Sequence, residues 1–106
     1  MIKVFRYRTA AGAEPLTDWL NELSDKRAQA KVRMRIKRVE AGNFGDAEAV
    51  GEGVFELREH LGAGYRVYFG RHGRVVVILL CGGTKKGQAA DIKAAKQYWA
   101  DWKRRQ

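Results

Sequence analysis

The chain has 106 residues, which is the length of one domain and leaves little room for a second. Lysine and arginine number 21 against 12 aspartate and glutamate residues, so the formal net charge is +9, while 45% of the residues are hydrophobic. The hydrophobic fraction excludes a disordered chain, and the positive excess favours a polyanionic partner. Nucleic acid is the first candidate and an acidic protein the second. An anionic membrane comes third, and a basic domain without such a partner is the plain alternative.

Cysteine and histidine usage restricts the chemistry further. Cys81 has no second cysteine to pair with, which fits a reducing compartment, and it ends an apolar run, where a small buried side chain is the simplest interpretation. His60 and His72 have no neighbouring residues at the spacing of a metal site. We therefore expect a cytoplasmic protein that needs no metal and no cofactor and has no contact with a membrane.

The first half of the chain predicts one strand and two helices. Residues 2–8 alternate as a strand does, and Pro15 fits the first turn of a helix. Asp25 can cap a second helix, which Gly42 ends. The apolar stripes of the two helices are Leu16, Trp19, Leu20 and Leu23, then Ala28, Val32, Ile36 and Val39. Because the connection between the helices is short, we expect an antiparallel helical hairpin.

The second half begins with residues 43–53, which hold three glycines and are expected to form a loop. Strands are predicted at 54–61, 65–71 and 74–81, and the short glycine-containing turns between them indicate an antiparallel meander. The third of these strands is apolar at six consecutive positions, which is typical of a strand that is covered on both faces or lies at the centre of a sheet.

A glycine-rich basic loop at 82–88 leads into a last helix. The apolar stripe of that helix consists of Ile92, Ala95, Trp99 and Trp102. The order β-α-α-β-β-β-α predicts a single α+β domain over residues 1–106. We expect an antiparallel sheet with the N-terminal helical hairpin packed on one face and the helices together on one side.

A polar face is predicted on the first two strands of the meander. Apolar residues occupy one parity of each strand and polar residues the other, so a hairpin brings the polar sets together on the face away from the core. The polar set consists of Glu56, Arg58, His60, Arg66 and Tyr68. The loop that carries Lys85, Lys86 and Gln88 follows the next strand and is expected to overhang this face.

This set is suited to cleaving RNA without a metal. The reaction needs a base for the ribose 2′-hydroxyl, cations around the phosphate, and an acid for the leaving oxygen. Arg58 and Arg66 can bind phosphate bidentately. Lys85 and Lys86 are adjacent like charges, which favours loss of one proton, so one of them is a candidate acid or base. The alternatives are an ion pair of Arg58 with Glu56 and a plain turn at the lysines.

Two further residues are candidates for proton transfer or base stacking. Tyr68 can stack on a base or pass a proton, or it is a half-buried aromatic residue of the strand. His60 has an ordinary pKa of about 6.5, closest to neutrality among the set, or it is exposed at the strand end without a role. The glycines before Lys85 lack the spacing of a phosphate-binding nucleotide loop, which excludes a nucleotide site of that kind.

The second helix carries a basic surface. We expect Lys31, Arg35 and Arg38, together with Gln88 of the glycine-rich loop, to contact RNA or the ribosome. The alternative for the helix is a charged face in contact with solvent alone.

Several motifs together resemble a known family. They are Gly-Asn-Phe-Gly-Asp at 42–46, Val-Phe-Glu-Leu-Arg at 54–58, Gly-Ala-Gly-Tyr-Arg-Val-Tyr-Phe at 62–69, and Leu-Leu-Cys-Gly-Gly-Thr-Lys-Lys-Gly-Gln at 79–88, followed by Asp91, Ile92 and Ala95. The combination is similar to the HigB-like "addiction module killer" branch of the RelE/ParE toxin superfamily. The resemblance covers nearly the whole chain, and its motifs are specific in combination.

The resemblance implies the toxin of a type II toxin–antitoxin module. Many such toxins are metal-independent endoribonucleases that cut mRNA on the ribosome, and a helix-turn-helix antitoxin silences them. Operator DNA is then contacted only through the antitoxin complex. The ParE-like branch implies the alternative, inhibition of DNA gyrase by protein binding without nuclease activity. Arg58, Arg66 and the loop from Lys85 to Gln88 carry over, whereas a C-terminal catalytic tyrosine is absent, since Tyr98 falls inside the last predicted helix.

Overall fold

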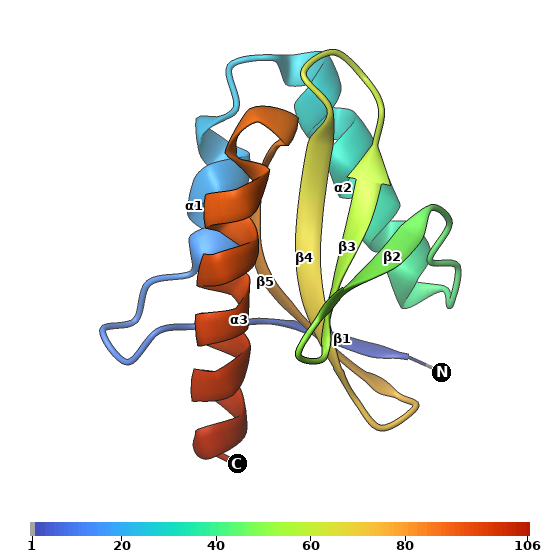
Figure 1. The fold of residues 1–106 in the computed structure, drawn as a ribbon. Helices are drawn as coiled ribbons and strands as arrows, with labels where there is room; N and C mark the ends of the chain where they lie inside the picture. Colours follow the sequence, from blue (N-terminus) through green and yellow to red (C-terminus); the bar gives the residue numbers. More distant parts are fainter. Residues whose placement is uncertain (1) are drawn as a thin grey trace.

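The computed structural model describes residues 2–106, which form a five-stranded sheet, three α-helices and one turn of 3-10 helix (Figure 1). The elements in chain order are β1 (Lys3–Arg6), α1 (Pro15–Glu22), α2 (Lys26–Glu40), β2 (Ala47–Gly51), β3 (Val54–Glu59), β4 (Tyr65–His72), β5 (Val76–Thr84), η1 (Lys85–Gly87) and α3 (Gln88–Arg104). The predicted α+β class is confirmed. The predicted element order is correct except that it lacked β2.

The sheet is mixed rather than wholly antiparallel, which corrects the prediction. The strand order is β1-β5-β4-β3-β2, and every neighbouring pair is antiparallel except β1 and β5, which are parallel. The parallel pair arises because β5 keeps one edge free after its hairpin with β4, and the N-terminal strand occupies that edge. β1 and β2 are therefore the two outer strands of the sheet.

Strand β2 lies in the segment that we predicted to be a loop, and that prediction was wrong. Two of the three glycines of the segment serve the β2–β3 turn, where Gly51, Glu52 and Gly53 all have positive φ angles. A positive φ is unfavourable for residues with a Cβ, so glycine on either side of Glu52 allows the tight reversal. A strand of alanine, glutamate and valine then pairs with β3 on the sheet edge.

Helices cover both faces of the sheet, whereas we expected them all on one side. One core lies between the sheet and the N-terminal helices α1 and α2, and it includes Leu16, Leu20, Val32, Val39, Val67 and Phe69. A second core lies between the sheet and α3, and it includes Tyr7, Tyr68, Ile78, Leu80 and Trp99. Because β5 contributes to both cores, the prediction of a strand covered on both faces is confirmed.

Local sequence signals account for where the helices lie. The Asp25 side chain accepts hydrogen bonds from the backbone amides of Arg27 and Ala28, which caps α2 as predicted. The close approach of α3 to β4 depends on Gly70, because a Cβ at that position would lie 2.4 Å from the Trp99 ring. Within residues 2–106, no helix combines the length and the apolar character needed to cross a bilayer.

Candidate functional site

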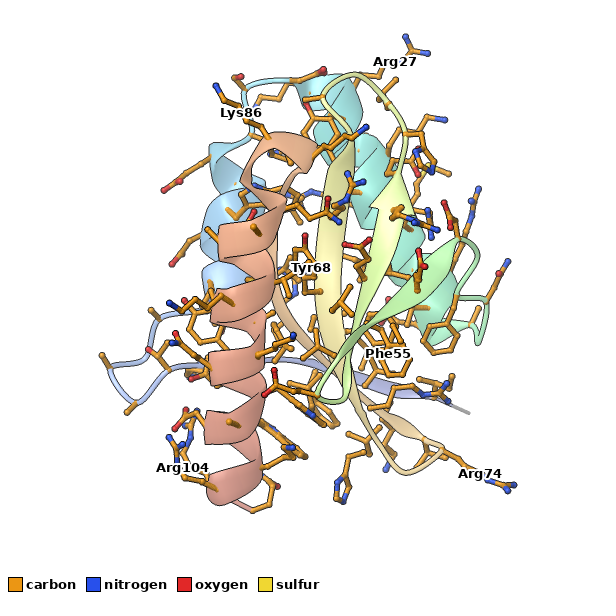
Figure 2. All side chains as sticks on the ribbon, in the orientation of Figure 1. Arg27, Phe55, Tyr68, Arg74, Lys86 and Arg104 are labelled. Carbon is orange, nitrogen blue, oxygen red and sulfur yellow. The ribbon has the colours of Figure 1, made fainter. Side chains whose placement is uncertain are left out.

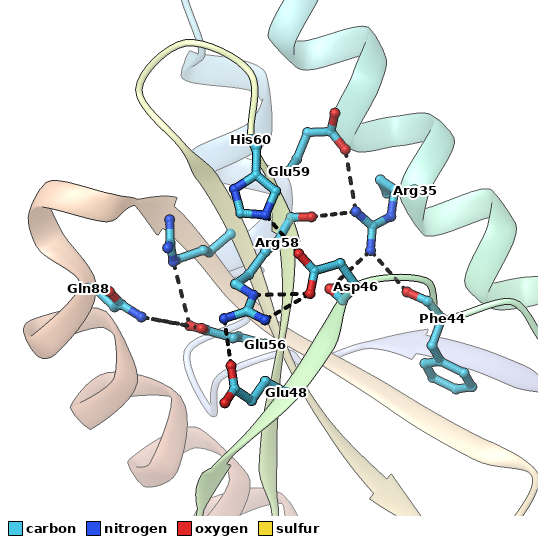
Figure 3. Close-up of polar contacts among 10 residues, drawn as sticks. Arg35, Phe44, Asp46, Glu48, Glu56, Arg58, Glu59, His60 and Gln88 are labelled. Carbon is cyan, nitrogen blue, oxygen red and sulfur yellow. Dashed lines mark hydrogen bonds and ion pairs between the residues drawn. The ribbon is translucent and has the colours of Figure 1, made fainter.

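The polar face of β3 and β4 has the predicted register. Glu56 lies opposite Tyr68, and Arg58 lies opposite Arg66, on the face that α3 covers. The apolar residues of the same strands, among them Leu57 and Val67, point into the core with α1 and α2. The predicted parity is therefore confirmed, but the expectation that this face lies away from the core was wrong, because α3 packs a second core on it. Figure 3 shows the polar contacts that residues of this face make with one another and with neighbouring elements.

A buried polar cluster occupies the centre of this face. The Gln88 amide donates to both carboxylate oxygens of Glu56, at 3.3 and 3.1 Å, and the Arg66 guanidinium Nε lies 3.7 Å from the same carboxylate (Figure 3). Arg66 also donates to the Gly64 carbonyl at 3.0 Å. Only 3% of Glu56 and 7% of Arg66 is exposed. We expected Arg66 to face solvent or substrate; it lies on the expected face, but the beginning of α3 covers it.

The lysines of the glycine-rich loop lie at the edge of this cluster. Lys85 and Lys86 are both exposed on η1. The Lys85 backbone amide donates to Gly64, and a Cβ at Gly64 would touch both the Arg66 guanidinium at 3.2 Å and the Lys85 side chain at 3.4 Å. Lys85 and Arg66 are therefore neighbours, as the sequence predicted for a loop that overhangs the polar face.

Arg58 lies in a second, more exposed cluster. Its guanidinium donates to Asp46 at 2.8 and 3.2 Å and forms an ion pair with Glu48 on β2 (Figure 3). His60 Nε2 lies 2.7 Å from the other oxygen of the Asp46 carboxylate. Glu48 and Asp46, rather than Glu56, thus provide the ion pairs of Arg58.

The Asp46 carboxylate gives this cluster a measurable pH signature. Hydrogen bonds from Arg58 first, and from His60 second, lower the pKa of Asp46 below its ordinary value of 3.8. We expect Arg58→Met to raise the pKa of Asp46 in an NMR titration, and His60→Ala to raise it by less. Because the pKa of Asp46 is lower in the folded state, its hydrogen bonds with Arg58 and His60 stabilise the fold at neutral pH. This contribution is lost as the pH falls through the folded-state pKa. An unchanged Asp46 titration in Arg58→Met would contradict this assignment.

Tyr68 has a different setting from the one a stacking or proton-relay residue needs. Its side chain is fully buried, and its hydroxyl has no hydrogen-bond partner among the described residues. Burial first, and then the charges of Glu56 and Asp91, raise the pKa of Tyr68. The phenol therefore stays protonated at physiological pH, and its ring cannot reach a nucleotide base in this conformation.

Cys81 is buried, as the sequence predicted, and burial raises the pKa of its thiol to about 12. The thiolate is the nucleophilic form of cysteine, so this group is unreactive at neutral pH.

The basic residues of α2 do not share one role. Lys31 and Arg38 are exposed, as surface contacts require. Arg35 is 8% exposed and donates to the Arg58, Phe44 and Asp46 carbonyls, and it forms an ion pair with Glu59 (Figure 3). Its position follows from the helical period, because residue 35 falls on the apolar stripe between Val32 and Val39. The geometry assigns Arg35 to holding the chain before β2 against the end of β3.

A stability measurement can separate the two kinds of α2 residue. Arg35→Met removes several charged donors from buried carbonyl oxygens, and we expect the free energy of unfolding to fall by about 2 to 3 kcal/mol. Arg38→Met on the exposed face of the same helix is the matched control, with an expected change within about 0.5 kcal/mol. Urea denaturation gives both values. Equal effects of the two substitutions would count against a structural role for Arg35.

A shallow hollow next to α2 brings several predicted site residues together. It is lined by Arg27, Lys31, Arg35, Asp46, Arg58, Glu59, His60 and Leu61. Most of these residues are basic, and the hollow lies beside the turn that follows β3. Within residues 2–106, no group of three or more histidine, cysteine or acidic side chains is placed to hold a metal ion.

Sequence reasoning missed three carboxylates of the site. Asp46 and Glu48 fell in the segment that we predicted to be a loop, so no partner strand was available to place them. Glu56 was correctly placed on the polar face, but we did not assign it a role. Its position directly opposite Tyr68, beside two arginines, is the signal that indicates a paired, buried carboxylate.

Fold and site together define a small, basic α+β domain that carries a buried carboxylate and two arginines on one face of its sheet. A family model described as "Phage derived protein Gp49-like (DUF891)" matches residues 18–99. An "Uncharacterized protein" of Haemophilus influenzae strain Rd is 55% identical over 78 residues, which cover 74% of this chain and 79% of that protein.

The chain belongs to the Gp49-like family of phage-derived proteins. This family is of the RelE and addiction-module killer type and is associated with the toxins of toxin–antitoxin modules. The resemblance read from the sequence is confirmed at that level, and assignment to the HigB-like branch stays a prediction. Membership implies an antitoxin as the partner.

Proposed function

We propose that this chain is the toxin of a type II toxin–antitoxin module and that it arrests translation by cutting mRNA on the ribosome without a metal. The observation that carries the proposal is the arrangement on the polar face. A carboxylate, Glu56, lies 3.7 Å from the Arg66 guanidinium, with Arg58 on the same strand and Lys85 beside Arg66. One proton acceptor among several cations is what cleavage through a 2′-hydroxyl requires.

Each residue has a defined task in this proposal. Glu56 takes the proton from the 2′-hydroxyl as that oxygen attacks the neighbouring phosphorus. Arg66 and Arg58 donate to the phosphate oxygens, whose negative charge grows in the transition state. Lys85 or Lys86 supplies a proton to the departing 5′-oxygen. Because Gln88 donates to both Glu56 oxygens, substrate binding must displace its side chain before the carboxylate can accept a proton.

The remaining candidates act on binding. The basic hollow that holds Lys31, Arg58 and His60 is positioned for the RNA backbone beyond the scissile phosphate, and Arg38 extends the positive surface along α2. Tyr68 lies opposite Glu56 in the buried part of the same face and stays neutral. A helix-turn-helix antitoxin is the proposed silencing partner, and operator DNA is contacted only through the complex with it.

The experiment that tests the proposal uses purified chain, ribosomes and a short messenger. Cuts within codons are expected with Mg²⁺ as the sole divalent ion, at the concentration that keeps ribosomes assembled, and they should disappear when ribosomes are omitted. The same preparation is added to a DNA gyrase supercoiling assay. Intact messenger together with gyrase inhibition would overturn the nuclease proposal in favour of a ParE-like, protein-binding poison. Cleavage that requires a transition-metal ion in addition to the Mg²⁺ that ribosomes need would overturn its metal-independent step.

A further inference from the structure

An apolar surface lies at the end of the sheet away from η1. Phe5 on β1 is 53% exposed, and Val75 in the β4–β5 turn is 50% exposed. Phe5 also lines an open hollow, together with His72, Val76, Ile78, Trp102 and Gln106. The apolar side chains of this hollow lie around the exposed Phe5 ring, and exposed apolar patches mark interaction sites.

Within residues 2–106, one side of the β1 backbone, beside this surface, has no neighbouring strand to pair with. β1 is an outer strand that pairs with β5 alone. The backbone amides of Lys3 and Tyr7 donate to the carbonyls of Val75 and Leu79 on the side of β5. Successive amides of a strand point to opposite sides, so the amides of Val4 and Arg6 point toward the open edge. An open edge of this kind can accept an added strand.

Charge selects the kind of strand that can be added. Among residues 2–106, Lys3, Arg6 and Arg74 have no carboxylate within ion-pairing distance, and all three are exposed around this surface. A second copy of the chain would bring Lys3 and Arg6 against the same residues of its partner, and like charges on adjacent strands are unfavourable. An acidic segment has the opposite charge and is favoured.

We infer that the free edge of β1 binds an extended, acidic segment of a partner protein, which adds a strand to the sheet and inserts an apolar side chain into the hollow beside Phe5 and Trp102. The inference rests on the proposed function in one respect, because the antitoxin is the protein expected to supply that segment. β5 and β4 lie between β1 and the strand that carries Glu56, so a segment bound at the outer edge of β1 need not touch the proposed catalytic residues (Figures 1 and 2).

A labelled peptide provides the test. The probe is a capped, fluorescein-labelled octapeptide of alternating glutamate and valine, and the matched control peptide has lysine in place of glutamate. Anisotropy should show saturable binding of the acidic peptide alone. Phe5→Ala should weaken it about tenfold, the equivalent of about 1.4 kcal/mol. Met34→Ala removes an apolar side chain of equal exposure, 53%, from α2 and should leave binding unchanged.

Amide exchange shows where the peptide lies. In NMR spectra the acidic peptide should slow hydrogen exchange at Val4 and Arg6, with Gly12 in the exposed loop after β1 unaffected. Equal binding of the two peptides, no loss in Phe5→Ala, no binding at millimolar peptide, or slowed exchange elsewhere would each overturn the inference. Phe5→Ala should cut messenger at the wild-type rate if the proposed function holds, so failure of docking and failure of catalysis are measured separately.

Discussion

Glu56→Gln is expected to lower the rate of RNA cleavage at least a hundredfold while the protein stays folded. An amide has nearly the shape of a carboxylate and remains within reach of Gln88, but it cannot accept the proton of a 2′-hydroxyl. Loss of a positioned general base costs roughly a hundredfold to ten-thousandfold in rate. The substitution also leaves the buried Arg66 guanidinium without its carboxylate, so we expect the free energy of unfolding to fall by about 3 kcal/mol, which a small domain can lose and stay folded.

The matched control is Glu52→Gln in the β2–β3 turn. That carboxylate is exposed and pairs with Lys96, away from the polar face. Single-turnover cleavage on ribosomes measures the rate, and urea denaturation measures stability. Wild-type cleavage by Glu56→Gln would show that the carboxylate is not the base, and an unfolded Glu56→Gln would assign it a structural role alone.

Arg66→Met is expected to be the most destabilising substitution on the polar face. It leaves the Glu56 carboxylate buried without a cation, and breaking a buried pair in this way costs about 3 to 5 kcal/mol. That loss is a large share of the roughly 5 to 15 kcal/mol that stabilises a small domain. The double variant Glu56→Gln/Arg66→Met removes both charges, so we expect it to recover most of the lost stability and none of the cleavage.

Arg66→Lys separates catalysis from folding. A lysine keeps the positive charge beside Glu56 but cannot donate in the bidentate geometry of a guanidinium. Stability should therefore stay near that of the wild type, while cleavage falls about tenfold or more. Full stability in Arg66→Met would show that Glu56 and Arg66 are not coupled. Full activity in Arg66→Lys would exclude bidentate phosphate binding.

The strands that could be predicted from the sequence are those joined by short turns. β3, β4 and β5 follow one another with connections of five and three residues, so their order and the parity of Glu56, Arg58 and Arg66 follow from local rules. β2 was not predicted because its two alanines and one glutamate have weak strand propensity, and because the glycines in and around it gave a loop signal although Gly51 and Gly53 form one turn.

Long-range placement could not be predicted in the same way. Nothing local to residues 3–6 tells which strand they pair with, since the partner residues 76–79 are far along the chain. The unbroken apolar run of β5 did indicate cover on both faces, and that requirement already implied a helix on the second face. Arg35 could have been placed correctly from the sequence. Its charge suggested the surface, but its place on an apolar helical stripe indicated the burial that the structure shows.

The pairing of β1 with β5 bears on how the protein is made. A chain emerging from the ribosome presents its N-terminal strand early, but β5, the strand that receives it, comes last among the five. Gln88 and the first turn of α3, which cover Glu56 and Arg66, follow later still. The nascent chain therefore holds no assembled sheet and no complete polar face until most of it has been synthesised. We therefore expect the growing chain to be unable to cut messenger before β5 and the η1 lysines have been synthesised.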